Sequence, residues 1–265
     1  MDQYDLVNRQ FGSTAKNYLT SAVHAQGADL QRLTRRVQQQ QPNRILDLGC
    51  GGGHASYAAA AGAVGQVVAY DLSEEMLGVV KEEATRRGLG NLTTQQGSVD
   101  ALPFADASFE LIVSRYSAHH WMQIEASIAE AARVLAPGGT LIIIDVVAPQ
   151  TPLYDTVLQT IELLRDASHV RDYRESEWRA MLGAAGLCVD NSDTWKLALN
   201  FDAWIKRIGT APARVAALQT TMGALPKEAR DYFSIQADCS FAIDTAWIES
   251  SRPAGAVVAG CATTT

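Results

Sequence analysis

The sequence predicts an α/β fold built on a mostly parallel β-sheet that carries helices on both faces. Three observations support this prediction. Short apolar segments alternate with helix-forming segments up to about residue 150, a glycine-rich turn joins the first apolar segment to a helix, and the second apolar segment ends in an acid. Alternating strands and helices produce parallel sheets, because each helix returns the chain to the edge where the previous strand began.

Five strands are expected where apolar and β-branched residues cluster. They cover residues 45–48, 67–70, 92–96, 111–114 and 140–147. Helices are expected between them, over residues 55–61, 73–87 and 124–135. Ser73 suits the N-cap of the second helix, because its hydroxyl can accept a hydrogen bond from a first-turn N–H group. Pro137-Gly138-Gly139 is expected to stop the third helix before the fifth strand.

The pattern becomes less regular after Pro149. There we expect helices over 153–165 and 175–185, a sixth strand ending near Trp195, a helical stretch over 201–232 and a last strand over 240–248. The chain is accordingly divided into an N-terminal helical arm or lid (1–40), a core (41–150), a region that completes the sheet and adds a helical cap (151–252), and a flexible tail (253–265).

Composition excludes several classes of function. The chain has 265 residues, 47% of them hydrophobic, a formal net charge of -7 and a pI near 5.2, which argues against a nucleic-acid partner because phosphate binding needs a basic surface. There is no run of 18 apolar residues and no signal-like N-terminus, so we expect a cytoplasmic protein without a membrane span. Four scattered cysteines without C-x-x-C spacing predict no metal site.

The stretch from Arg44 to His54, RILDLGCGGGH, is the most informative part of the chain. It predicts a buried strand that ends in a turn with glycines at 49, 51 and 53, which allow a sharp bend and bring bare backbone against a ligand. Asp71 ends the next strand roughly 20 residues later, where a carboxylate can hold ribose hydroxyls. The two features together indicate a nucleoside-binding site.

Asp47 indicates which kind of nucleoside the site binds. The glycine spacing departs from the dinucleotide pattern G-x-G-x-x-G, and a carboxylate just before the turn would repel a pyrophosphate but attract an ammonium group. An NAD-dependent oxidoreductase is therefore disfavoured. The stretch instead resembles the first motif of the class I S-adenosylmethionine (SAM)-dependent methyltransferases, h-h-D/E-h-G-x-G-x-G, where h is hydrophobic.

The resemblance implies a Rossmann-like, seven-stranded sheet, SAM as cofactor and S-adenosylhomocysteine as product. It also implies cofactor contacts from the N-terminal arm, the glycine turn and the strand ends. These contacts are Tyr18, Asp47, Gly49, Cys50, Gly51, Gly53, Asp71, Leu72, Met76, Ser98, Val99, Ser114 and Arg115.

Two further segments resemble the same family. Residues 96–104, QGSVDALPF, are similar to G-D-A-x-x-L-P-F, whose acid binds the adenine amino group; Ser98 replaces that acid here, and the backbone of Val99 keeps its contact. Residues 133–141, RVLAPGGTL, are similar to R-h-L-x-P-G-G-x-L, a structural segment.

Within the family, the chain most resembles methyltransferase type 11, and in it the YafE-like proteins and the ubiquinone/menaquinone C-methyltransferases. Residues 10–18, QFGSTAKNY, are similar to their F-G-x-x-A-x-x-Y, and residues 164–171, LRDASHVR, also occur in a similar form.

Residues after the fourth strand are expected to face the sulfonium, and a histidine there suits a general base. We expect His120 in this role, with His119 as the second choice. Aromatic side chains of the arm and of this loop are expected to line the acceptor site, together with one histidine further along the chain. These residues are Tyr4, Phe11, Tyr116, Trp121 and His169.

The expected function is methyl transfer from SAM to a small, planar aromatic or heteroaromatic acceptor, on nitrogen, oxygen or carbon. The alternatives are quinone-ring C-methylation, carboxyl O-methylation of a carrier protein, N-methylation of an azapteridine of the toxoflavin type, and a non-catalytic SAM-binding regulator. The sequence predicts no oligomeric state.

Overall fold

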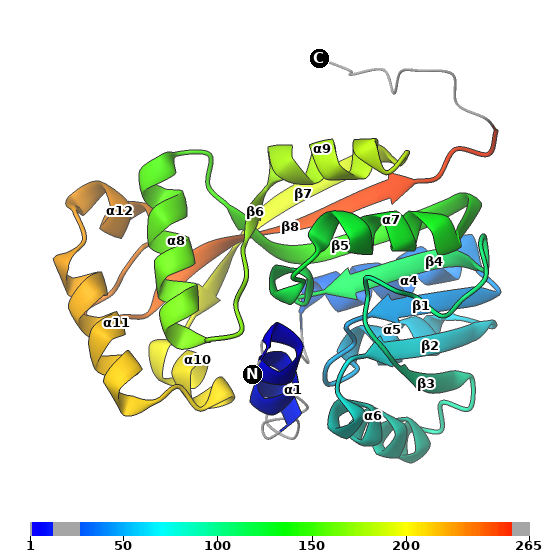
Figure 1. The fold of residues 1–265 in the computed structure, drawn as a ribbon, viewed down its shortest axis with the longest axis horizontal. Helices are drawn as coiled ribbons and strands as arrows, with labels where there is room; N and C mark the ends of the chain where they lie inside the picture. Colours follow the sequence, from blue (N-terminus) through cyan, green and yellow to red (C-terminus); the bar gives the residue numbers. More distant parts are fainter. Residues whose placement is uncertain (1, 13–26, 256–265) are drawn as a thin grey trace.

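A computed structural model describes residues 2–12 and 27–255 (Figure 1). Its strands are β1 (Arg44–Leu48), β2 (Gln66–Asp71), β3 (Leu92–Gln96), β4 (Phe109–Arg115), β5 (Leu135–Ala148), β6 (Tyr173–Arg174), β7 (Cys188–Leu199) and β8 (Phe241–Ser251). They form one sheet in the order β3-β2-β1-β4-β5-β8-β7, with β6 paired to the end of β5. β1 to β5 are parallel, and β8 is antiparallel to both neighbours. The predicted mostly parallel α/β sheet is confirmed, with the two-residue β6 as an addition.

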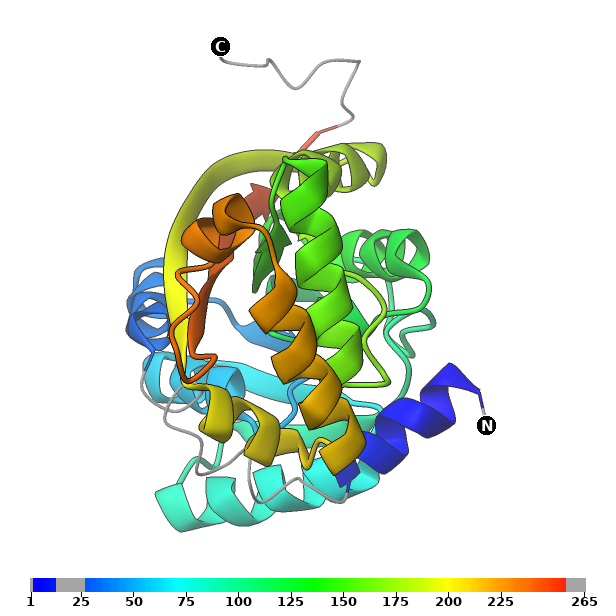
Figure 2. The same cartoon turned by 90° about the vertical axis from the view of Figure 1, so that its left-hand side faces the viewer.

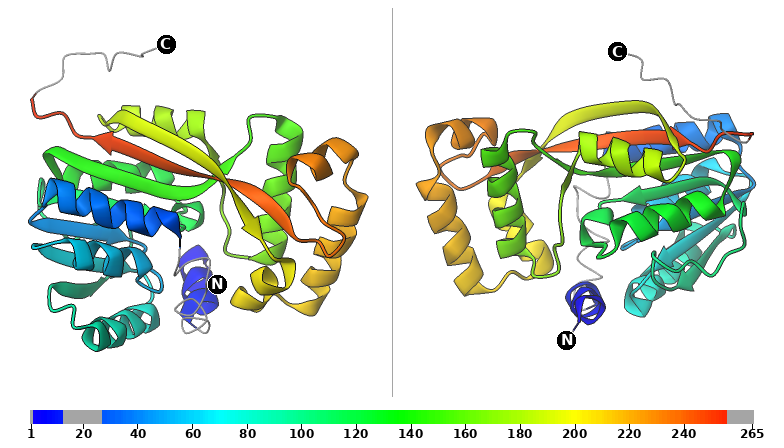
Figure 3. Two further views of the ribbon diagram at one scale, coloured as in Figure 1. Left: turned by 180° about the vertical axis from the view of Figure 1, so that it is seen from behind. Right: turned by 45° about the horizontal axis from the view of Figure 1, so that its top comes forward.

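Helices cover both faces of this sheet and also lie at its edge and beyond it. They are α1 (Gln3–Gly12), α4 (Ala28–Gln40), α5 (His54–Gly62), α6 (Glu74–Arg87), α7 (Ile124–Val134), α8 (Pro152–Arg165), α9 (Glu175–Ala184), α10 (Phe201–Ile208), α11 (Pro212–Ala224) and α12 (Lys227–Tyr232), with a 3-10 turn η1 (Ala118–His120). α7 and α9 pack on one face through Ile128 and Trp178, while α4 and α5 pack on the other through Leu33 and Ala59 (Figure 3).

Local signals explain where two elements begin and end. Ser73 caps α6 as predicted, since its hydroxyl accepts a hydrogen bond from the Met76 N–H group at 3.3 Å. The expectation for Pro137-Gly138-Gly139 is wrong in detail, because α7 already ends at Val134 and Leu135 pairs with Phe109. The next pair is Leu111 with Thr140, so β5 advances five residues against two on β4, and the proline–glycine stretch forms this irregularity.

The last two strands are long, and most of the helices that follow β5 lie near one end of them. β7 and β8 run past the core, and α8, α10, α11 and α12 gather around their far end (Figures 1 and 2). A separate apolar cluster holds this region together, with Leu158, Trp204, Leu218, Phe233 and Phe241 among its buried members. The predicted helical stretch over 201–232 is three helices, the first of which ends at Gly209 in a left-handed conformation (φ 70°).

The first 40 residues do not form one unit in the described part of the chain. α4 belongs to the core, where Leu33 and Val37 are fully buried. α1 instead lies at the carboxyl edge of the parallel strands, between the core and the far helices (Figure 1). No described helix combines the length and the apolar character needed to cross a membrane.

Candidate active site

The turn after β1 needs glycine for two different reasons. Gly49 has a φ of +67°, and a Cβ atom there would lie 1.8 Å from Ser117 Oγ, so both its conformation and its surroundings exclude a side chain. Gly51 has a φ of +48°, but its added Cβ would meet nothing within 4 Å. The bare backbone at Gly51 therefore faces open space at the end of the strand.

Asp71 joins this turn to the end of β2. Its Oδ2 accepts a hydrogen bond from the Gly51 N–H group at 2.8 Å, and its Oδ1 accepts one from the Ser73 N–H group at 2.9 Å. Each carboxylate oxygen has a further lone pair with which it can accept a hydroxyl proton. Burial raises the pKa of Asp71, against the lowering effect of these two bonds.

A cavity of about 1040 Å³ opens beside the turn at the carboxyl ends of β1, β2 and β4. Its size suits a nucleoside-sized ligand. Among the predicted site residues, it is lined by Tyr4, Phe11, Asp47, Gly49, Cys50, Gly51, Asp71, Leu72, Met76, Ser98, Val99, Arg115, Tyr116, His120 and Trp121.

Four predicted site residues do not line this cavity, and a fifth is not among the described residues. Gly53 is the N-cap of α5, and Ser114 is buried with its hydroxyl unbonded; neither lines this cavity. His119 and His169 lie behind the cavity wall and are described below. Tyr18 falls outside the described residues.

Asp47 is a fully buried carboxyl group in the floor of the cavity. Its Oδ2 accepts a hydrogen bond from Ser56 Oγ at 2.6 Å, while its Oδ1 has no hydrogen-bond partner. Burial raises the pKa of Asp47 to about 7, partly offset by the bond from Ser56. A buried carboxyl with one free oxygen suits a cationic ligand, which would stabilise its charged form.

Asp100 was missed from the sequence although it lies in the quoted motif. It lines the cavity two residues after Ser98, and its carboxylate accepts hydrogen bonds from the hydroxyls of Ser98 and Tyr4 and, at 3.2 Å, from Gln123 Nε2. The bond from Tyr4 ties α1 to the cavity. The acid itself was the available signal, since the family motif has a carboxylate in the same turn.

A second cavity, of about 560 Å³, adjoins the first on the side of the far helices. Phe11, Tyr116 and His120 line both cavities and so form the boundary between them. The second cavity has apolar walls from β5, β7, β8 and α10 and several charged groups, of which the sequence analysis singled out only His119. The residues beyond that boundary are His119, Val146, Glu162, Arg165, Asp172, Leu197, Leu199, Trp204, Arg207 and Ile243.

His120 is a neutral imidazole at this boundary. Its Nδ1 lies 3.1 Å from the carbonyl oxygen of Ser168, which can only accept, so Nδ1 carries the ring proton and Nε2 carries the lone pair. Burial and the neighbouring charge of His119 lower the pKa of His120 to about 4. The ring is therefore neutral at physiological pH.

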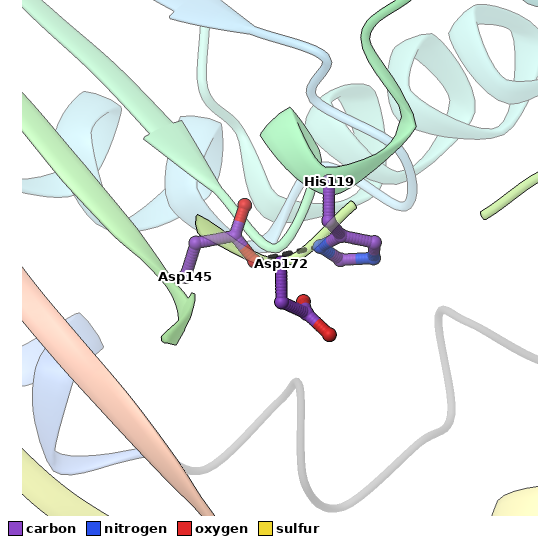
Figure 4. A group of neighbouring side chains, drawn as sticks. All are labelled: His119, Asp145 and Asp172. Atoms are coloured by element: carbon purple, nitrogen blue, oxygen red, sulfur yellow. Dashed lines mark hydrogen bonds and ion pairs between the residues drawn. The ribbon is translucent and has the colours of Figure 1, made fainter. Parts of the chain in front are cut away.

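His119 has the opposite character and lines only the second cavity, where it lies beside Asp145 and Asp172. Figure 4 shows these three side chains. Its Nδ1 lies 2.6 Å from Asp145 Oδ1. Burial alone would lower the pKa of His119, but the charge and hydrogen bond of Asp145 raise it to about 9. Asp172 completes this group, and one ligand atom from each of the three residues lies within 4.8 Å of the others.

The segment 164–171, singled out in the sequence, packs against these histidines. The N–H groups of Val170 and Arg171 both donate to the His119 carbonyl oxygen, at 2.9 and 3.2 Å, and Ser168 receives the bond from His120. His169 itself lies outside both cavities, with a 3% exposed side chain whose Nε2 is 3.1 Å from Gln159 Oε1. Its predicted contact with the acceptor has no support in this geometry.

Comparison with known proteins assigns the chain to a family. Residues 46–143 match the methyltransferase domain model. The chain is 46% identical to the uncharacterized protein YafE of Escherichia coli (strain K12), over 72% of this chain and 92% of that protein. It is 36% identical to the uncharacterized methyltransferase YcgJ of Bacillus subtilis (strain 168), over 85% of this chain and 88% of that protein.

The crystal structure of the YcgJ protein superposes with a TM-score of 0.80 over 85% of this chain and 100% of that chain, at 32% identity. A ubiquinone/menaquinone biosynthesis C-methyltransferase of Rhizobium leguminosarum is 29% identical over 59% of this chain and 64% of that protein. The cavity beside the glycine turn thus lies in a fold shared with these proteins, and the chain belongs to the class I SAM-dependent methyltransferases.

Proposed function

We propose that this enzyme binds SAM in the cavity beside the glycine turn and methylates a small molecule held in the second cavity. The observation that carries this proposal is the boundary at His120. A neutral histidine stands between a nucleoside-sized cavity, whose residues suit SAM, and a smaller cavity with aliphatic walls and several charged side chains.

The residues of the first cavity fit SAM in chemistry. Asp71 would accept the ribose hydroxyls, the free Oδ1 of Asp47 would attract the amino group, and the open space at Gly51 would take the ligand against the backbone. Ser98, Val99 and Asp100 would surround the adenine side, and Tyr4 would hold α1 over it as a lid.

When bound, SAM supplies a methyl group activated on a sulfonium. The chain's own tasks are then to align the acceptor, to exclude water and to remove the acceptor's proton. His120 lines both cavities, and its Nε2, which lies 3.9 Å from Asp166 Oδ2, would accept that proton. The helices α8, α10, α11 and α12 would act as the cap that shields the acceptor.

The second cavity favours a planar aromatic or heteroaromatic acceptor. Aliphatic side chains of β5, β7 and β8 and the ring of Trp204 provide its walls, and about 560 Å³ suits a molecule of one or two rings. Methylation on nitrogen, oxygen or carbon fits this shape. Quinone-ring carbon methylation has the added support of the Rhizobium relative's name; a carrier-protein carboxyl group or an azapteridine nitrogen are the other candidates.

Ligand-dependent stability tests the cofactor half of the proposal. SAM and S-adenosylhomocysteine, each at ~100 times its dissociation constant, should stabilise the folded protein by about 2.7 kcal/mol, and NAD should not. Stabilisation by NAD alone would refute the proposal.

Incubation with methyl-labelled SAM and a metabolite extract of the source organism, followed by mass spectrometry, tests the transfer. A labelled small molecule is expected. Tight SAM binding with no labelled product would instead favour the non-catalytic regulator.

A further inference from the structure

The second cavity contains a hydrogen-bond donor that no described residue satisfies, the Nε2–H group of His119. The other ring nitrogen, Nδ1, donates to Asp145 at 2.6 Å, and backbone N–H groups of Ala118 (2.9 Å) and Val146 (2.8 Å) hold that carboxylate in place. Because the pKa of His119 is raised to about 9, Nε2 also carries a proton at neutral pH. It lies on the far side of the ring from Asp145 (Figure 4).

Beside His119 lies a carboxyl group that lacks a hydrogen-bond donor, the side chain of Asp172. Asp172 is 1% exposed, and neither of its oxygens has a hydrogen-bond partner. His169 Nε2, at 3.8 Å, is too far to donate a hydrogen bond. Leaving a buried carboxyl group without a hydrogen bond costs more free energy than an ordinary hydrogen bond contributes. A ligand that donates a hydrogen bond to Asp172 would therefore be stabilised here.

We infer that His119 and Asp172 form a hydroxyl-binding site in the second cavity, which selects acceptors that carry an O–H group. A hydroxyl oxygen would accept from His119 Nε2, and its proton would go into a hydrogen bond with Asp172. The apolar walls would hold the rest of the molecule. This inference rests on the proposed function, because it identifies the occupant of the cavity as the methyl acceptor.

Other ligand groups fit this pair less well. An ammonium group has no lone pair to accept from Nε2–H. A carboxylate would add a negative charge close to Asp145, Glu162 and Asp172, and of the two arginines that line the cavity, Arg165 already lies 3.8 Å from Glu162. Burial raises the pKa of Asp172 well above its usual range, but a hydroxyl can donate or accept and so suits either state of this carboxyl group.

A divalent metal ion is the other occupant that a histidine and two carboxylates could suit. Two ligand atoms of a tetrahedral ion, each about 2.0–2.2 Å from the metal, lie roughly 3.3 Å apart. His119 Nδ1 and Asp145 Oδ1 are only 2.6 Å apart, the separation of a charge-assisted hydrogen bond. This spacing favours a shared proton over a shared ion.

Fragment binding tests the inference. The ¹⁵N-labelled protein, with and without saturating S-adenosylhomocysteine, is titrated with phenol, toluene and benzoate while the imidazole nitrogens are followed by NMR. Phenol should bind about ten-fold more tightly than toluene or benzoate, and it should shift the His119 Nε2 resonance. Asp172→Leu, which removes both the donor and the acceptor, and His119→Gln should each remove most of the phenol preference and leave affinity for S-adenosylhomocysteine unchanged. Asp202→Leu, on the exposed side of α10, is the matched control and should retain the preference.

Equal binding of phenol and toluene by the parent protein would overturn the inference, as would a phenol preference that survives both substitutions. Should His119→Gln not fold, Asp172→Leu, which is similar in size to the parent side chain, decides. Phenol binding that requires added Mn²⁺ or Zn²⁺ and disappears with EDTA would also overturn it, in favour of a metal site. Failure to bind S-adenosylhomocysteine is a separate result that refutes the proposed function, because the titration without it still measures hydroxyl selectivity.

Discussion

The backbone N–H group of Gly51 donates a hydrogen bond to Asp71 Oδ2 at 2.8 Å. This bond holds the glycine turn after β1 against the end of β2, and both residues line the same cavity. The same carboxylate also holds the Ser73 N–H group at the start of α6. Asp71 therefore has a structural role in addition to its proposed contact with ribose.

Asp71→Ala should show both roles. Affinity for SAM should fall at least about ten-fold, and the free energy of unfolding should fall by roughly 1.5–3 kcal/mol, the range for hydrogen bonds to a charged group. Isothermal titration calorimetry and urea denaturation measure the two effects. Normal SAM affinity in a folded variant would show that Asp71 does not bind the ribose.

Gly51→Ala should separate ligand contact from backbone strain. The added Cβ meets no protein atom within 4 Å, so the variant should lose only the roughly 1–2 kcal/mol that a left-handed alanine costs. It should nevertheless lose SAM affinity by ten-fold or more, as the Cβ occupies the ligand's place.

Gly88→Ala is the matched control for this experiment. Gly88 has a φ of +71° and equally open surroundings, but it ends α6 away from the cavity. It should lose similar stability in urea denaturation and keep its SAM affinity. Equal SAM affinity in both variants would place the ligand elsewhere.

Asp47 should make SAM binding depend on pH. With a pKa of about 7, its carboxyl group is increasingly ionised as pH rises from 6 to 8, and a cationic ligand binds the ionised form better. SAM affinity should therefore rise over this range in the parent, relative to Asp47→Asn, which has no titrating group there. Calorimetry at several pH values measures the difference. Parallel pH profiles for parent and variant would contradict the proposed contact.

His120→Ala should lower turnover by roughly 10²–10⁴-fold with SAM affinity nearly unchanged. Added imidazole should restore part of the rate, because it can occupy the space left by the ring. Since the pKa of His120 is about 4, the parent rate should not fall as pH decreases through 6.5. Near-parental turnover in the variant would mean that the acceptor needs no base.

His119 should stabilise the fold in a defined pH window. Its pKa is about 9 in the folded protein against 6.5 for an unperturbed histidine, so its contribution is complete below pH 6.5 and is lost as pH rises to about 9. This shift corresponds to about 3 kcal/mol. Between pH 6 and 9.5 the parent should lose about that much more stability than His119→Gln, as measured by urea denaturation. Equal losses would show that the ion pair with Asp145 does not shift the pKa.

Much of the cofactor side could be predicted from the sequence, because its chemistry is local. The glycines at 49 and 51 and the acids at 47 and 71 lie at the ends of two adjacent strands, and the period of the apolar segments alone predicts those strands. The N-cap at Ser73 likewise involves only the four consecutive residues from Ser73 to Met76. Such features depend on the backbone conformation of a short stretch, and short-range sequence patterns predict that conformation.

The residues that line the second cavity come from distant segments, and only the tertiary structure brings them together. His119 meets Asp145, 26 residues away, and Asp172 reaches the same point from the loop before β6, while Leu197 and Ile243 arrive on the long strands β7 and β8. Adjacent histidines look alike in sequence, yet the 3-10 turn places His119 against a carboxylate and His120 against a carbonyl group. Opposite pKa shifts follow, because burial and charge at a site depend on which distant elements pack around it.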